Sequence, residues 1–108
     1  MKIFVTLIAA AAAATFAAGT HAADAKAAEA LAKSSGCLAC HTVDTKLVGP
    51  SYKDIAGRYR NDKKAEASLV QKVKAGGKGA WGDIPMPPNG HVKDADLKTL
   101  VQWILSLR

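Results

Sequence analysis

The chain has 108 residues, 49% of them hydrophobic, and a formal net charge of +6. This length fits a single domain, and the sequence shows no internal repeat or domain boundary. The basic surplus favours acidic partners. Nucleic acid is a poor candidate, because no recognisable binding motif is present.

Residues 1–23 are typical of a secretory signal peptide. Lys2 supplies a positive start, and an apolar, Ala-rich run leads to small residues at Ala22 and Ala23. An uncleaved anchor is the alternative, but the apolar run is shorter than the ~20 residues that cross a bilayer. We therefore expect cleavage after Ala22 or Ala23, a single mature domain over residues 24–108 and no stable membrane insertion.

The first predicted helix begins with Asp24 as its N-cap and carries small apolar residues such as Ala28 and Ala32 on one face. Gly36 is placed to end this helix. The helix therefore leads directly into the two cysteines of the chain.

Those cysteines belong to Cys37-Leu38-Ala39-Cys40-His41, a C-x-x-C-H run that indicates covalent attachment of c-type haem. Thiols one helical turn apart can add to the two vinyl groups of one porphyrin, and the following imidazole can bind the iron. A thioredoxin-type site would need a βαβ neighbourhood, and structural zinc about four Cys or His ligands. Beyond this run the predicted mature chain holds only one more histidine. A plain disulfide would leave the histidine without a role.

Two helices are predicted after an irregular connection with a Gly49-Pro50 turn. The first covers residues 52–59 with Ser51 as its N-cap, and the second covers residues 64–75 and ends at Gly76-Gly77. A Gly- and Pro-rich loop over residues 76–90 follows. A loop of this length is functional or disordered as a rule, so we expect contact with haem to order it.

The last predicted helix, residues 94–107, has one continuous apolar face. That face is formed by Leu97, Leu100, Val101, Ile104 and Leu107. We expect it to pack on the Ala-rich first helix, which gives one all-α domain. Cleavage would remove both phenylalanines of the chain, so a buried porphyrin would supply much of the core.

Haem iron with a proximal histidine has one further axial position to fill. Met86 is the only methionine after the predicted signal peptide, and flanking prolines stiffen its backbone. His91 is the alternative ligand, but the preceding Asn89-Gly90 turn pair favours its exposure. We predict that Met86 is the ligand.

The chain closely resembles small bacterial class I cytochromes c of the c-551/c-552 type. The resemblance rests on the C-x-x-C-H run, Lys46-Leu47-Val48-Gly49-Pro50, the nine residues from Trp81 to Asn89 and Trp103-Ile104-Leu105. It covers nearly the whole mature chain. It implies the class I fold, with four to five short helices around one covalently bound haem c, and a location in the periplasm.

The resemblance also implies roles for single residues. His41 and Met86 would be the axial pair, and the Pro50 carbonyl would accept a hydrogen bond from the far ring nitrogen of His41. Asn89 would bond near the Met86 sulfur, and the Trp81 indole would donate to a haem propionate. Some relatives add an arginine to that propionate; a lysine, Lys72, stands at the matching place here.

The function that follows is one-electron transfer without catalysis. The family implies a shuttle in respiration or denitrification that serves partners such as nitrite reductase or a terminal oxidase. We expect a monomer that docks on redox proteins at the haem edge. The candidates for an apolar rim around this edge are Leu38, Leu47, Ile84, Pro85 and Pro87. Two alternatives stay open from the sequence: a haem enzyme or sensor with an open iron site, and a thiol-redox protein without haem.

Overall fold

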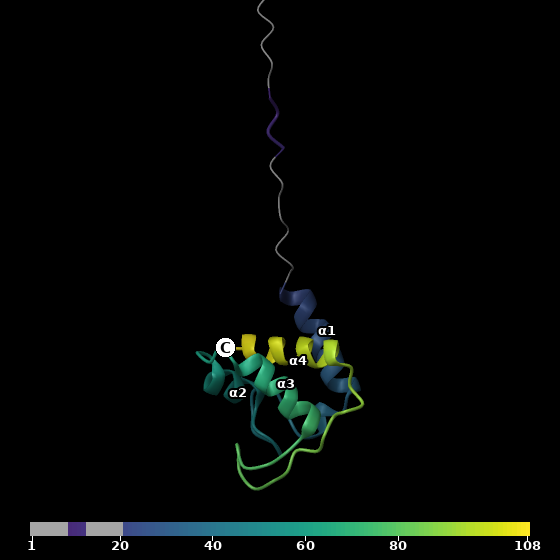
Figure 1. Ribbon diagram of the computed structural model, residues 1–108, viewed down its shortest axis with the longest axis vertical. Helices are drawn as coiled ribbons and strands as arrows, with labels where there is room; N and C mark the ends of the chain where they lie inside the picture. The colour runs from purple at the N-terminus through teal and green to yellow at the C-terminus, as the bar shows by residue number, and fades with distance from the viewer. Residues whose placement is uncertain (1–8, 13–20) are drawn as a thin grey trace, which may run out of the picture.

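The computed structural model describes residues 9–12 and 21–108 (Figure 1). Most of the predicted signal peptide, residues 1–23, lies outside the described residues. The described part contains the helices α1 (His21–Ser34), α2 (Tyr52–Tyr59), α3 (Ala65–Ala75) and α4 (Asp94–Ser106), and a short 3₁₀ turn, η1 (Cys37–Ala39). None of its helices is both long and apolar enough to cross a membrane.

Helix α4 is the central element of the fold, since it contacts α1, α2 and α3 (Figure 1). Its side chains Leu97, Leu100, Val101, Trp103 and Ile104 are buried. The predicted contact with α1 is confirmed. The contacts with α2 and α3 were not foreseen, because a helical apolar stripe shows which face is buried but does not identify the elements that cover it.

The ends of the helices follow from local sequence. Helix α1 begins at His21 rather than at Asp24, so the prediction that Asp24 caps it is wrong. The two alanines before Asp24 are strong helix formers and extend the helix by one turn. Gly36 follows the helix with φ 81°, in the left-handed region that favours glycine. Ser51 caps α2 as expected, because its hydroxyl accepts a hydrogen bond from the Asp54 N–H at 3.1 Å.

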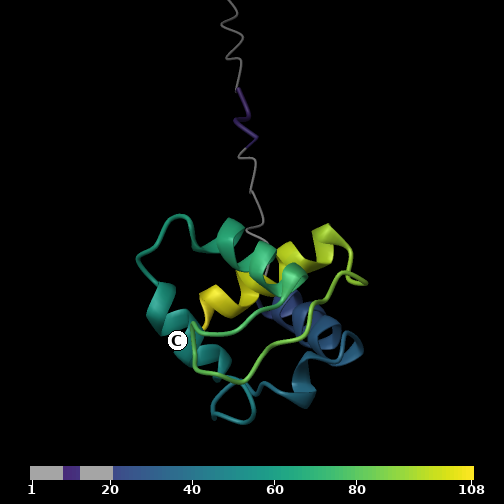
Figure 2. The ribbon, with the colours of Figure 1, turned by 60° about the horizontal axis from the view of Figure 1, so that its bottom comes forward.

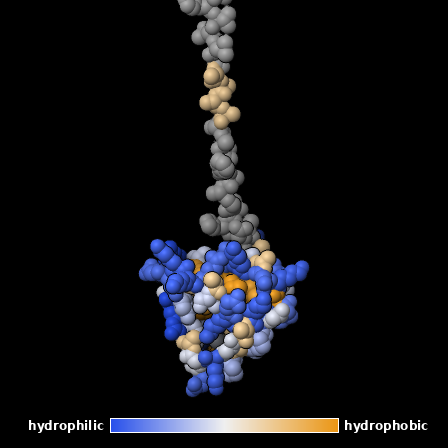
Figure 3. Space-filling model, in the orientation of Figure 1, coloured by the Kyte–Doolittle hydropathy of each residue, from blue (hydrophilic) through white to orange (hydrophobic). Residues whose placement is uncertain are grey.

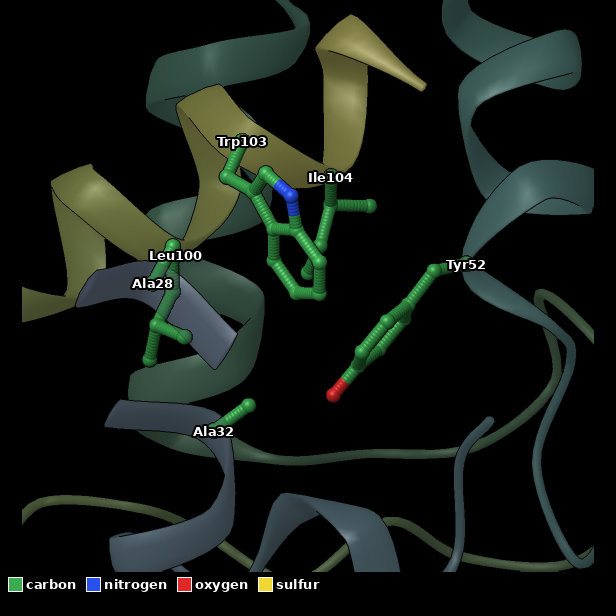
Figure 4. Close-up of a cluster of buried hydrophobic side chains, with 6 residues drawn as sticks. All are labelled: Ala28, Ala32, Tyr52, Leu100, Trp103 and Ile104. Atoms are coloured by element: carbon green, nitrogen blue, oxygen red, sulfur yellow. The ribbon is translucent and has the colours of Figure 1, made fainter. Parts of the chain in front are cut away.

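The close-packed core lies between α1, α2 and α4 (Figure 4). Ala28 and Ala32 of α1 are fully buried, and their small side chains allow α4 to approach closely. The rings of Tyr52 and Trp103 meet edge to face at 5.5 Å between centroids. This core fixes the start of α2, where the Tyr52 ring also reaches the functional site described below.

The segment between α3 and α4 has more order than its composition indicated. Gly77 and Met86 form an antiparallel bridge through backbone hydrogen bonds of 3.0 and 2.8 Å, and Gly79 donates to the Gly82 carbonyl at the tip. The two arms of this loop lie next to each other at this bridge (Figure 2). Residues 76–90, called the Met86 loop from here on, are thus held partly by their own backbone.

Candidate haem site

The C-x-x-C-H run forms one tight turn after α1. The Cys37 carbonyl accepts hydrogen bonds from Cys40 N–H at 3.2 Å and from His41 N–H at 3.0 Å. Both cysteines are free and half-buried. Both thiols and the imidazole line the same cavity, which is the arrangement that a cofactor attached through two sulfurs requires.

That cavity and its open mouth together enclose about 1010 Å³, part of which is open solvent. Its walls come from η1, α2, α3, the Met86 loop and α4, and most of the lining side chains are apolar. Apolar contributors include Ile55, Leu69, Val73, Leu100, Val101 and Ile104. A large apolar cavity with two thiols, an imidazole and a thioether fits a covalently bound haem.

His41 is held on three sides. Its Nδ1–H donates to the Pro50 carbonyl at 2.7 Å. Because a carbonyl only accepts, Nδ1 carries the proton, and in the neutral ring Nε2 keeps a free lone pair for a metal. The Tyr52 ring stacks on the imidazole at 5.2 Å between centroids and 22° between planes. His41 is only 8% exposed, so its ring is fixed in one orientation.

Gly49 forms the third side and has to be a glycine. A Cβ at this position would lie 2.6 Å from the His41 Cε1 atom, a distance too short for any side chain. The Gly49 N–H donates to the Cys40 carbonyl at 2.8 Å, which fixes the backbone beside the ring. The sequence identified this residue only as part of a turn; its contact with the imidazole depends on tertiary structure.

Met86 belongs to the lining of the same cavity, although it is far from His41 in sequence. Its backbone is fixed by the bridge to Gly77 and by Gly76, which ends α3 at φ 71°. A Cβ at Gly76 would lie 2.5 Å from the Met86 carbonyl oxygen, so the glycine lets the end of α3 touch the Met86 loop. His91 is exposed and is not among the residues that line the cavity.

Of the other predicted site residues, Trp81 and Lys72 line the cavity and Asn89 does not. The Asn89 amide donates to the carbonyls of Val73 and Pro87, both at 3.1 Å, and thereby ties the Met86 loop to α3. Trp81 lines the cavity and is 40% exposed. Lys72 reaches the cavity wall from α3 and is half-buried.

Burial changes the acid–base properties of the Cys37 thiol and of its neighbour Tyr52. Desolvation raises the pKa of Cys37, and a side-chain hydrogen bond with Tyr52 offsets part of that rise. The pKa of Tyr52 is raised as well, first by burial and then by the nearby Cys37. Cysteines in thiol-redox motifs have lowered pKa values, because the thiolate is the reactive form. The raised pKa of Cys37 therefore disfavours a thiol-redox site.

The family model described as Cytochrome c matches residues 25–108. The chain belongs to the cytochrome c family. It is 58% identical to cytochrome c-551 of Allochromatium vinosum, over 71% of this chain and 82% of the relative. It is 54% identical to cytochrome c-552 of Nitrosomonas europaea, over 72% of this chain and 76% of the relative.

Solved structures agree with this assignment. The crystal structure of wild-type Nitrosomonas europaea cytochrome c552 matches with a TM-score of 0.72 and 52% identity, over 74% of this chain and 99% of that chain. The chain is thus an all-α class I cytochrome c, its cofactor is covalently bound haem c, and it is an electron carrier rather than an enzyme. The predictions of fold, cofactor and family are confirmed.

Proposed function

We propose that this protein is a periplasmic, monomeric carrier of single electrons whose haem iron is held by His41 and Met86. One observation carries the proposal. An imidazole and a thioether from distant parts of the chain line one apolar cavity together with both attachment thiols. Haem c supplies one-electron chemistry when bound, and the role of the polypeptide is to hold the iron in one geometry.

The residues around the cavity support this role. The hydrogen bond from His41 to Pro50 fixes the ring and raises its basicity as a ligand. The Met86 thioether favours Fe(II), and the apolar walls disfavour the extra charge of Fe(III), so both raise the reduction potential. In the described residues, no buried side-chain nitrogen or oxygen lacks a hydrogen-bond partner. An environment in which these polar groups are all hydrogen-bonded is rigid, which suits electron transfer with little rearrangement.

The surface around the cavity mouth fits docking to redox proteins. Val48 and Ile84 line the cavity together with Lys72 and Lys78, and they are 45% and 65% exposed. Leu47, next to Val48 in the chain, is 53% exposed, whereas Leu38 is exposed but does not line the cavity. Figure 3 shows a surface dominated by hydrophilic residues with smaller apolar areas between them. We propose that redox partners of respiration or denitrification, such as nitrite reductase or a terminal oxidase, dock on this rim.

Replacing Met86 by alanine tests the axial pair. Attachment through Cys37, Cys40 and His41 stays intact, so haem should remain bound. The near-infrared sulfur-to-iron band should vanish, and the potential should fall because the ligand that favours Fe(II) is lost. Absorption spectroscopy and a redox titration of the purified variant measure both effects.

His91→Ala is the matched control, because His91 is the alternative ligand, yet it is exposed and does not line the cavity. It should keep the band and the potential of the parent. A haem enzyme with an open iron site is the competing function. It would be indicated if the parent bound carbon monoxide readily and Met86→Ala changed neither spectrum nor potential.

A further inference from the structure

The tip of the Met86 loop is held by an arginine that neither the motif nor the cavity includes. Arg58 Nη1–H, from the last turn of α2, donates to the Ala80 carbonyl at 2.6 Å. Its guanidinium carbon lies 4.4 Å from the centroid of the Trp81 ring. In the part of the chain that the structure describes, no other side chain outside the loop hydrogen-bonds to residues 78–84.

The loop tip needs such a support. Gly79 and Gly82 on either side of Ala80 and Trp81 have φ values of 103° and 117°, a conformation that costs glycine more entropy than other residues to fix. Trp81 is 40% exposed, so core packing does not fix its ring. A planar guanidinium can stack on an aromatic face and donate to a carbonyl at the same time, which an ammonium group cannot match.

Arg58 also brings a positive charge next to two residues of the cavity wall. Ala80 and Trp81 line the cavity, whereas Arg58 does not, so it contacts them from outside. We propose that Arg58 is a positioning residue for the haem: it holds the Trp81 indole at the cavity wall and places a permanent positive charge behind it. The inference rests on the proposed function and on the role that the family resemblance implies for Trp81, donation to a haem propionate.

Three variants of the haem-loaded protein test this inference. Arg58→Gln removes the guanidinium contacts with Ala80 and Trp81 and the positive charge. Arg58→Lys keeps the charge but loses the planar guanidinium. Arg60→Gln removes a positive charge two residues away. Arg60 is exposed and has no hydrogen bond or ion pair with the loop among the described residues. The readouts are the hydrogen exchange of the Trp81 indole Nε1–H by nuclear magnetic resonance and the reduction potential.

Arg58→Gln should speed exchange of the Trp81 Nε1–H by about tenfold, the factor that corresponds to about 1.4 kcal/mol. It should also lower the potential more than Arg60→Gln does, because a positive charge near the iron disfavours Fe(III). Arg58→Lys should keep most of the potential but show the faster exchange, since the two roles of the side chain are separable.

Two results would overturn the inference. Equal potentials and unchanged exchange in Arg58→Gln and Arg60→Gln would make Arg58 an ordinary surface residue. A lowered potential with unchanged Trp81 exchange would leave only the charge and remove the positioning role. Failure of the proposed function looks different, since the parent itself would then lack the near-infrared band of Met-ligated haem.

Discussion

At the scale of single residues, the contacts of His41 show how the polypeptide alone fixes the ring that we propose as an axial ligand. The Pro50 carbonyl fixes the proton on Nδ1, the Tyr52 ring covers one part of the imidazole, and the Gly49 backbone packs against Cε1. None of these contacts involves the iron. The ring is therefore oriented by the polypeptide, and the proposed coordination would not have to supply that ordering free energy.

Gly49 is the most sensitive of these contacts to substitution. In Gly49→Ala the new Cβ would lie 2.6 Å from His41 Cε1, so the ring or the backbone has to shift and the hydrogen bond to Pro50 weakens. We expect the free energy of unfolding of the haem-loaded protein to fall by about 1–3 kcal/mol. Guanidinium denaturation, followed by haem absorbance, measures this change.

Gly57→Ala is the control for that experiment. A Cβ at Gly57 meets nothing within 4 Å, and Gly57 lies inside α2, where alanine is favoured over glycine by about 1 kcal/mol. This variant should be as stable as the parent or more so. Equal unfolding free energies for the two variants would contradict the role given to Gly49.

At the scale of secondary-structure elements, local sequence predicted α2, α3 and α4 to within a residue at each end. The predicted ranges 52–59, 64–75 and 94–107 compare with Tyr52–Tyr59, Ala65–Ala75 and Asp94–Ser106. Caps and helical periodicity are local signals, which is why they sufficed. The predicted start of α1 was wrong, because the helix propensity of Ala22 and Ala23 outweighed the capping preference of Asp24.

Contacts between elements were less accessible to sequence analysis. The Gly77–Met86 bridge, the stacking of Tyr52 on His41 and the contacts of Arg58 all join residues that are distant in the chain. No periodicity or motif encodes such pairs in a single sequence. Met86 could be proposed early because few other ligands were left, whereas the backbone that holds it became visible only in three dimensions.

Asn89 links α3 to the Met86 loop, and the importance of this link can be tested. Its amide donates to carbonyls of α3 and of the Met86 loop, both at 3.1 Å. Asn89→Ala removes both side-chain donors. The Val73 carbonyl keeps the Asn89 backbone N–H and the Pro87 carbonyl is exposed, so each lost hydrogen bond should cost about 0.5–1.5 kcal/mol. We expect lower stability to denaturant and a weaker near-infrared sulfur band, since the loop that carries Met86 is loosened.

Asn61→Ala serves as the control for the loss of an asparagine amide. Asn61 is exposed in the turn after α2 and makes no side-chain hydrogen bond among the described residues. Its replacement should change the unfolding free energy by less than about 0.5 kcal/mol. If Asn89→Ala had the same near-infrared band and the same unfolding free energy as Asn61→Ala, the Asn89 side chain would not be needed to hold the Met86 loop on α3.

At the scale of the whole molecule, the charge distribution bears on how partners find the cavity mouth. The chain has 15 Lys and Arg residues against nine Asp and Glu residues. Some of the positive charge is neutralised locally, since Lys53 pairs with Asp44 and Lys74 with Asp94. Lys72 and Lys78, in contrast, line the cavity and form no ion pair among the described residues. Positive charge is thus available where electrons would enter and leave.

Reversing one of these charges tests whether they steer association. Lys78→Glu and Lys26→Glu change the net charge equally, but Lys78 lines the cavity whereas Lys26 lies on α1 and does not. Stopped-flow mixing with an acidic redox protein should show a larger loss of rate for Lys78→Glu at low salt, because steering depends on charge near the contact. The difference should shrink toward physiological salt, where the Debye length is about 8 Å. A parent rate that does not change with ionic strength, or equal losses in both variants, would mean that these lysines are merely solvated.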